Sequence, residues 1–156
     1  MKKIFDIFAL LELAMLFCLT GLALWGPNAI TGPIPTHFDS SGHANAWGKP
    51  ANLLFLPLIT SFLYGLLTTV ARFPAIFNYP VVVTPENRPK LEALTLLLLS
   101  VMKAELIAVF LWLQYAGIQS ARDSRGHLFV AFTSVCLLLI FGSLVGFFVA
   151  LVRAAK

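Results

Sequence analysis

Residues that could do chemistry gather in one polar segment, at positions 33–49, between two long apolar stretches. His37, Asp39 and His43 are of types that bind zinc, but three ligands from one short loop need a favourable fold, and no Cys or Glu assists them. A serine beside His37 and Asp39 would make a weak catalytic triad, because triad members are normally positioned by separate rigid elements. We therefore expect recognition here, with no metal, no cofactor and no catalytic residue.

The order of residues in this segment predicts its shape. Two prolines near its start favour an extended chain. Asp39 and Gly42 then occupy the first and fourth positions of a type I turn. Trp47 suits the membrane interface, and Lys49 suits lipid phosphate or closure of the loop on itself. The residues expected to contact a ligand or partner are His37, Phe38, Asp39, Gly42, Asn45, Trp47 and Lys49.

The composition indicates that this segment belongs to a membrane protein. Hydrophobic residues make up 59% of the chain and charged residues only 12%, outside the usual balance of soluble domains. The net charge is +4, yet the basic residues lie mainly beside the ends of apolar runs, which indicates membrane topology and not nucleic-acid binding. Cys18 and Cys136 fall in mid-span positions, where cysteine mostly behaves as a small apolar residue.

Four apolar runs are long enough to cross a bilayer, since a helix needs about 20 apolar residues to do so. They are interpreted as helices because isolated strands would leave backbone groups unpaired in lipid. We predict an all-α membrane protein, a single domain over residues 1–156 built as a four-transmembrane-helix bundle. Its expected helices are 4–25, 53–71, 91–117 and 128–152, with a structured outer loop at 26–52 and a cytoplasmic loop at 72–90.

The orientation follows from the Lys and Arg residues of the short connections. With the N-terminus inside, the inner side receives Lys2, Lys3, Arg72, Arg88, Lys90, Arg153 and Lys156. The outer side receives only Lys49, Arg122 and Arg125. Both termini are therefore predicted to be cytoplasmic, and the first helix is expected to be a retained signal anchor.

Of the charged residues inside the predicted spans, Glu12, Lys103 and Glu105 are the candidates for a role at membrane depth, where a charge is costly and usually faces a partner or a wet cavity. Lys103 and Glu105 are two positions apart, so they point to nearly opposite sides of one helix. We expect Glu12 to pair with Lys103 across the bundle. The favoured role of this pair is to fix the helix register, and the alternative is a proton or ion pathway.

Two further patterns concern packing and connection. Gly142 and Gly146 form a GxxxG motif in the fourth span, and it either packs this helix within the monomer, which we favour, or binds a second copy. Between the second and third spans, the valines at 81–83 are expected to be strand-like. Asn87 is expected to cap the next helix, with Pro89 in its first turn.

The outer segment carries a recognisable pattern on Pro35, Thr36, His37, Phe38, Asp39, Gly42, Asn45, Trp47, Gly48 and Lys49. Its order and its place after a first transmembrane helix resemble the membrane domain of unknown function numbered 1648, which also occurs in SdpI-like immunity proteins. The resemblance implies a helical protein of bacterial envelopes. It further implies that some relatives confer immunity to a secreted antimicrobial peptide and signal its presence across the membrane. SdpI-like members are longer than this four-span chain.

Three functions fit these features. The first is a non-enzymatic, multi-pass protein of the bacterial inner membrane whose outer loop recognises a peptide, a lipid or a partner protein, in immunity or signalling. The second is an accessory subunit of a larger membrane complex, or a homo-oligomer. The third, a small transporter or channel, is less favoured because four helices with three buried charges form a meagre pathway without oligomerisation. The lipid bilayer is the expected partner in all three, and nucleic acid in none.

Overall fold

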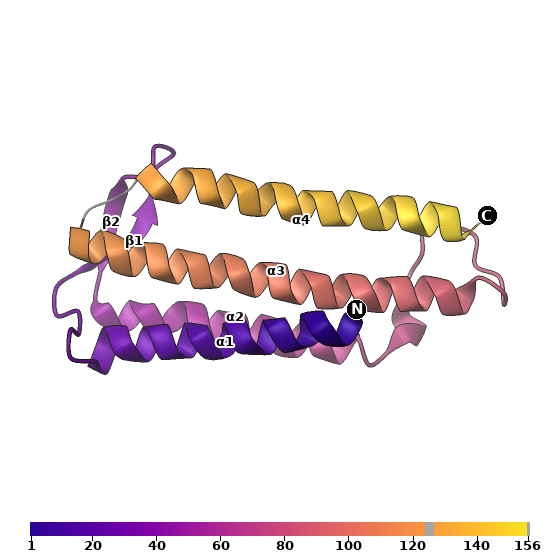
Figure 1. Ribbon diagram of the computed structural model, residues 1–156, viewed down its shortest axis with the longest axis horizontal. Coiled ribbons are helices and arrows are strands. Elements are labelled where there is room, and N and C mark those ends of the chain that lie inside the picture. Colours follow the sequence, from indigo (N-terminus) through magenta and orange to yellow (C-terminus); the bar gives the residue numbers. More distant parts are fainter. Residues whose placement is uncertain (124–126, 156) are drawn as a thin grey trace.

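The computed structural model describes residues 1–123 and 127–155. Four long helices lie side by side, and a small hairpin covers one end of the bundle (Figure 1). The helices are α1 (Lys2–Trp25), α2 (Phe55–Val70), α3 (Arg88–Asp123) and α4 (His127–Ala154). Within the described residues, four helical segments are long and apolar enough to cross a membrane, so the predicted helical membrane bundle is confirmed at this level. Arg125 and Lys156, used above to predict orientation, lie outside the described residues.

The helices extend past most of the boundaries predicted from the apolar runs. α3 was expected over 91–117 but spans Arg88–Asp123, roughly 54 Å at about 1.5 Å per residue. An apolar run shows only which part of a helix suits the lipid core. The helix itself continues through polar residues until a helix-breaking residue or a turn ends it. α2 begins later than expected, because the 3-10 helix η1 (Pro50–Leu54) precedes it.

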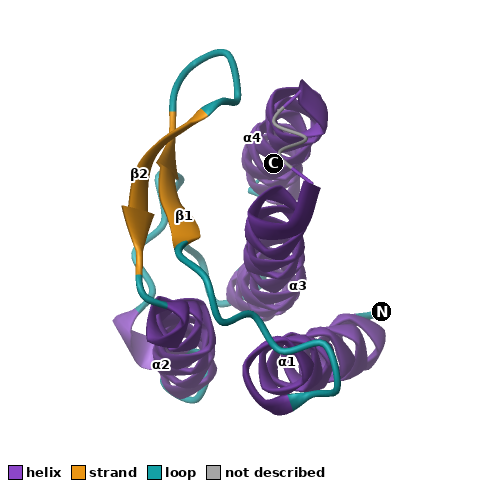
Figure 2. Ribbon diagram, turned by 90° about the vertical axis from the view of Figure 1, so that its left-hand side faces the viewer, coloured by secondary structure: helices purple, strands orange, loops and turns teal. Residues whose placement is uncertain are grey.

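The centre of the bundle is α3, which lies between α4 and the pair formed by α1 and α2 (Figure 2). α1 and α3 run in the same direction: Ala9 packs with Ala104 and Ile107 near the end where both chain termini lie, and Ala23 packs with Ile118 near the hairpin end. Small residues at these contacts let the two backbones approach closely. We call the two ends of the bundle the terminal end and the hairpin end.

Helix α4 packs mainly against α3, through side chains spaced by four residues. Ser143 donates a hydrogen bond to Glu105 Oε2 at 3.0 Å, and Phe147 and Leu151 pack in the cluster around Leu91 of α3. Gly142 directly precedes Ser143, and Gly146 directly precedes Phe147. Neighbouring residues of a helix point in directions about 100° apart, so the two glycines face away from α3. A Cβ at Gly142 or Gly146 would meet nothing within 4 Å. The expectation that these two glycines pack α4 within the monomer is therefore wrong.

The connection between α2 and α3 is ordered by its own hydrogen bonds. The Thr84 N–H donates to Asn87 Oδ1 at 2.8 Å, and the Asn87 N–H donates to Thr84 Oγ1 at 3.3 Å. This reciprocal pattern is a capping box around Thr84, one turn before α3. Asn87 occupies the predicted position directly before α3, where its carbonyl accepts the Leu91 N–H at 3.0 Å, but its side chain bonds Thr84 and not the helix. The valines at 81–83 form no strand. Val81 instead packs against the cluster around Leu91, so its side chain is partly buried there without a partner strand.

Candidate functional site

The hairpin end of the bundle carries the residues that were predicted to recognise a ligand. β1 (Ile34–Phe38) pairs antiparallel with β2 (Ala44–Gly48), with an irregular register around His37. An isolated two-stranded hairpin is marginally stable at best, so it needs a surface to pack on. Ile34 supplies this anchor, because it is buried in a cluster formed with α1, η1 and α3. The sequence predicted the extended start of this segment but not the pairing of its two halves.

The turn of the hairpin is centred on the side chain of Asp39. The Gly42 N–H donates to the Asp39 carbonyl at 2.9 Å, which confirms a β-turn with these residues at its first and fourth positions. Gly42 has a φ of 83°, a backbone conformation that glycine adopts without steric cost. Asp39 Oδ1 accepts the N–H groups of His43 and Ser41, each at 2.9 Å. The His43 N–H, and then that of Ser41, hold the pKa of Asp39 below its usual value.

His37 and Asn45 face each other across the two strands. His37 Nδ1 lies 2.5 Å from Asn45 Oδ1. An amide oxygen only accepts hydrogen bonds, so His37 Nδ1 is the donor in this contact. Two of the predicted recognition residues are thus brought together, with the imidazole held in one orientation at an exposed position.

A cavity of about 660 Å³ lies under the hairpin. In Figure 2 the hairpin rises beside α3 from the end of α2, with β1 on the side that faces α3. The volume is within the range of about 300–1,000 Å³ that is usual for small-molecule sites. The cavity is lined by Ile34, Pro35, Thr36, His37, Phe38, Asn52, Leu53, Phe55, Leu56, Leu113, Gln114 and Gly117. Of the predicted recognition residues, His37 and Phe38 line it.

Gln114 forms the polar part of the inner wall of this cavity, and the sequence analysis missed it. Its side chain is 2% exposed, and Nε2 donates to Thr20 Oγ1 at 2.8 Å and to the Leu53 carbonyl at 2.9 Å. Thr20 in turn donates to the carbonyl of Leu16 at 2.7 Å. A search for charged residues does not find a neutral amide in an apolar run. Gln114 could still have been found as a polar residue at membrane depth, where such side chains usually hydrogen-bond to another helix.

The remaining predicted recognition residues lie outside the cavity. Trp47 is exposed on β2, and Lys49 is exposed just before η1, where its carbonyl accepts the N–H of Asn52 at 2.9 Å. Gly48, between them, packs closely: a Cβ there would collide with the side-chain amide of Asn52 and lie 2.8 Å from the methyl group of Thr36, so these side chains would have to shift. This close approach holds β2 against η1 and shapes the rim of the cavity.

At the terminal end, the partner of Lys103 is Asp6 and not Glu12. Lys103 Nζ lies 2.7 Å from Asp6 Oδ1 and 3.5 Å from Thr68 Oγ1, and it sits 5.2 Å from the centre of the Tyr64 ring. The predicted pairing with Glu12 is wrong because a helical side chain points toward the N-terminus of its own helix, here toward the terminal end, where Asp6 lies. The sequence analysis missed Asp6, although it lies within the predicted first span and forms with Lys2, 3.3 Å away, an i,i+4 pair visible in the sequence.

The two polar contacts that join α1 and α3 are separate from each other. The Lys103 pair and the Gln114 pair are 11 residues apart on α3, roughly 16 Å along the helix axis. Between them, Ala9, Leu16 and Ile107 are buried and apolar. Each of the two contacts ties α3 to α1, and these apolar side chains separate one contact from the other.

No protein-family model, curated protein or solved structure matches this chain. The family resemblance of residues 35–49 therefore stays a prediction carried by those residues. The functional argument consequently depends on the geometry of the hairpin end and of the bundle interior.

Proposed function

We propose that this chain is a non-enzymatic protein of the bacterial inner membrane that recognises an amphipathic peptide or lipid at its outer surface. In this proposal both termini are cytoplasmic and the hairpin faces outward, following the excess of Lys and Arg in the inner connections. The single observation that carries the proposal is the cavity of about 660 Å³ between β1, α2 and α3. Apolar walls with a few fixed polar groups are typical of small-ligand sites.

The lining of the cavity suggests how such a ligand would be held. Phe55, on the cavity wall, is 66% exposed on the surface of α2, so an apolar chain can enter sideways from the outer leaflet. Phe38, Leu56 and Leu113 would contact that chain, and His37 at the exposed edge of β1 would accept a hydrogen bond from the ligand's polar group. The resemblance of residues 35–49 suggests a secreted antimicrobial peptide as the ligand, in an immunity or signalling role.

Photo-crosslinking in native membranes tests this function. A crosslinking amino acid at Phe38 is expected to give one specific adduct, and Leu113→Trp, which fills the cavity, is expected to abolish it. The matched control places the crosslinker at Phe62, which is 68% exposed on α2 and does not line the cavity. No adduct from Phe38, or the same adduct from Phe62, would reject recognition by this cavity.

A second candidate function, an accessory subunit or homo-oligomer, is favoured by the exposure of the GxxxG motif on α4. Gly142 and Gly146 present a smooth surface with open space beside it, the type of surface on which another transmembrane helix packs closely. Gly146→Leu is expected to break such an assembly. Gly65→Leu on α2 is the matched control, because a Cβ there also meets nothing within 4 Å. A wild-type monomer in mild detergent would rule this function out.

A further inference from the structure

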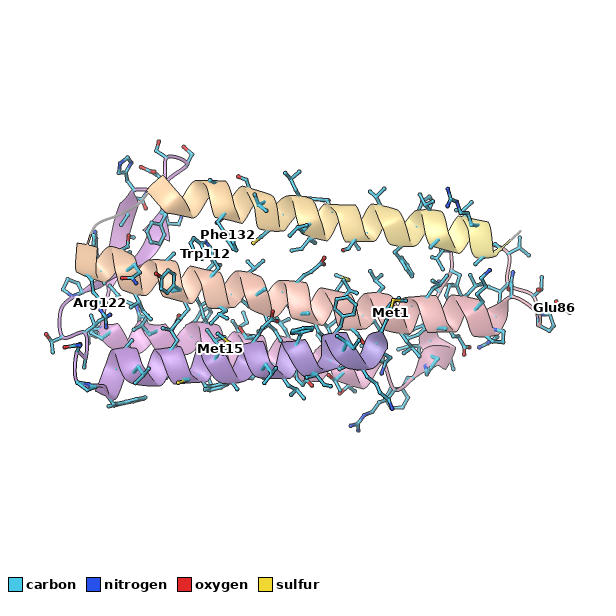
Figure 3. All side chains as sticks on the ribbon, in the orientation of Figure 1. Met1, Met15, Glu86, Trp112, Arg122 and Phe132 are labelled. Atoms are coloured by element: carbon cyan, nitrogen blue, oxygen red, sulfur yellow. The ribbon has the colours of Figure 1, made fainter. Side chains whose placement is uncertain are left out.

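A second cavity, of about 380 Å³, lies between α1, α3 and α4 and shares no lining residue with the cavity under the hairpin. Glu12 is its one acidic residue, and three aromatic side chains, Trp112, Tyr115 and Phe132, line it as well. Figure 3 shows the Trp112 and Phe132 side chains together in the space between α3 and α4. The rest of the wall is apolar and comes from Met15, Leu19, Ala108 and Leu111.

Two polar atoms of this cavity's lining residues are buried without a partner. Glu12 Oε2 and Trp112 Nε1 make no hydrogen bond to any described residue. The other ionisable side chains that were singled out in the spans are engaged, since Lys103 pairs with Asp6 and Glu105 accepts a hydrogen bond from Ser143. A buried polar group without a partner is costly, and at membrane depth it is a sign of function. Among the described carboxyl groups of the spans, Glu12 is therefore the one with a buried oxygen that has no partner.

The surroundings of Glu12 favour a positive charge on an apolar body. The face of an aromatic ring attracts cations, and aromatic cages are a common way to bind quaternary ammonium groups. The Trp112 ring centre lies 4.2 Å from that of Phe132 and 5.7 Å from that of Tyr115, so the three rings form one connected wall. Tyr115 is 43% exposed and Phe132 41% exposed, which opens the cavity to the bundle surface that contacts lipid.

We propose that this cavity binds a lipophilic organic cation, whose charged group pairs with Glu12 and whose apolar body lies against Trp112, Tyr115 and Phe132. The ligand enters from the bilayer, where such cations concentrate. An oxygen atom on the ligand would additionally satisfy the Trp112 N–H. This site is independent of the cavity under the hairpin, because it uses different residues and a different side of α3.

Equilibrium binding of tetraphenylphosphonium to the full chain in lipid nanodiscs tests the proposal. Glu12→Gln keeps the side-chain shape and removes the charge, so it is expected to weaken binding at least about tenfold, as for other charge-assisted contacts. Glu105→Gln is the matched control and is expected to bind within about twofold of wild type, since Glu105 faces Ser143 and lies outside the cavity lining. Tetraphenylborate has the same shape and the opposite charge, and in separate samples it should not lose affinity in Glu12→Gln.

Three results would overturn the proposal: no binding of tetraphenylphosphonium beyond that of empty nanodiscs, equal binding by wild type and Glu12→Gln, or equal losses in Glu12→Gln and Glu105→Gln. Circular dichroism establishes that each variant is folded. If Glu12→Gln does not fold, Ala108→Phe provides the second variant, because it fills the cavity without changing a charge. It is expected to abolish binding, and unchanged binding in this variant would place the cation elsewhere.

Discussion

Lys103 Nζ on α3 lies 2.7 Å from the Oδ1 of Asp6 on α1, a residue 97 positions earlier in the chain. Two parallel helices are thereby fixed at one axial offset, and α2 joins them through Thr68 and Tyr64. The same offset places Gln114 beside Thr20 farther along the two helices. The Lys103 pair therefore sets the alignment on which the cavity at the hairpin end depends.

Removal of the Lys103 charge should destabilise the bundle. Lys103→Met leaves Asp6 without its closest cation, and we expect a loss of about 2–3 kcal/mol, at the low end for a buried pair because Asp6 is 25% exposed. Lys2→Met is the control, since Lys2 is 47% exposed and should change stability little. Thermal unfolding in detergent measures both. The exchange Asp6→Lys with Lys103→Asp should be more stable than either single variant, whereas Glu12→Lys with Lys103→Glu should not.

The buried amide of Gln114 should show energetic coupling to Thr20. Gln114→Leu removes the donor to both Thr20 and the Leu53 carbonyl, and a loss of about 2 kcal/mol is expected for buried groups left unpaired. Thr20→Val removes the other side of one hydrogen bond. A double-mutant cycle on unfolding free energies should give a coupling of about 0.5 kcal/mol or more. Strict additivity of the two losses would contradict the contact.

Gly42 should be the least replaceable glycine of the hairpin turn. Its φ of 83° is strained for any other L-residue, so Gly42→Val should cost the hairpin about 1–2 kcal/mol. Gly32→Val is the control, because a Cβ there meets nothing within 4 Å and its backbone φ is not in the left-handed range. Limited proteolysis of the loop compares the two variants. Equal cleavage rates would mean that the turn does not depend on Gly42.

The turn should loosen in acid because of Asp39. Its pKa in the folded hairpin is lowered by the N–H groups of His43 and Ser41 from an ordinary value of 3.8. A group with a lowered folded-state pKa stabilises the fold above its unfolded-state pKa and loses that effect as the pH falls through the folded-state pKa. The amide proton shifts of Ser41 and His43 should therefore change as the pH falls below about 4. Asp39→Asn retains an acceptor oxygen without titrating and should abolish this change.

The helices and the hairpin turn could be predicted from local sequence patterns. Apolar runs near the length of a bilayer determined four helical spans, because a membrane helix satisfies its backbone within one continuous segment. Asp39 and Gly42 determined the turn, since the hydrogen bonds that close it join residues at most four positions apart. Predicting these features requires no information about which distant segments pack beside them.

Only the tertiary structure decided which side chains meet. The rotation and axial offset of each helix depend on packing against its neighbours, and they bring Lys103 to Asp6 and not to the predicted Glu12. The rotation of α4 turns Gly142 and Gly146 outward, and the rotation of α1 leaves Glu12 facing an aromatic cavity. The sequence by itself thus determined four spans and a turn, because both arise from neighbouring residues. The charge pair and the two cavities arise where distant segments pack together, and the tertiary structure alone decided them.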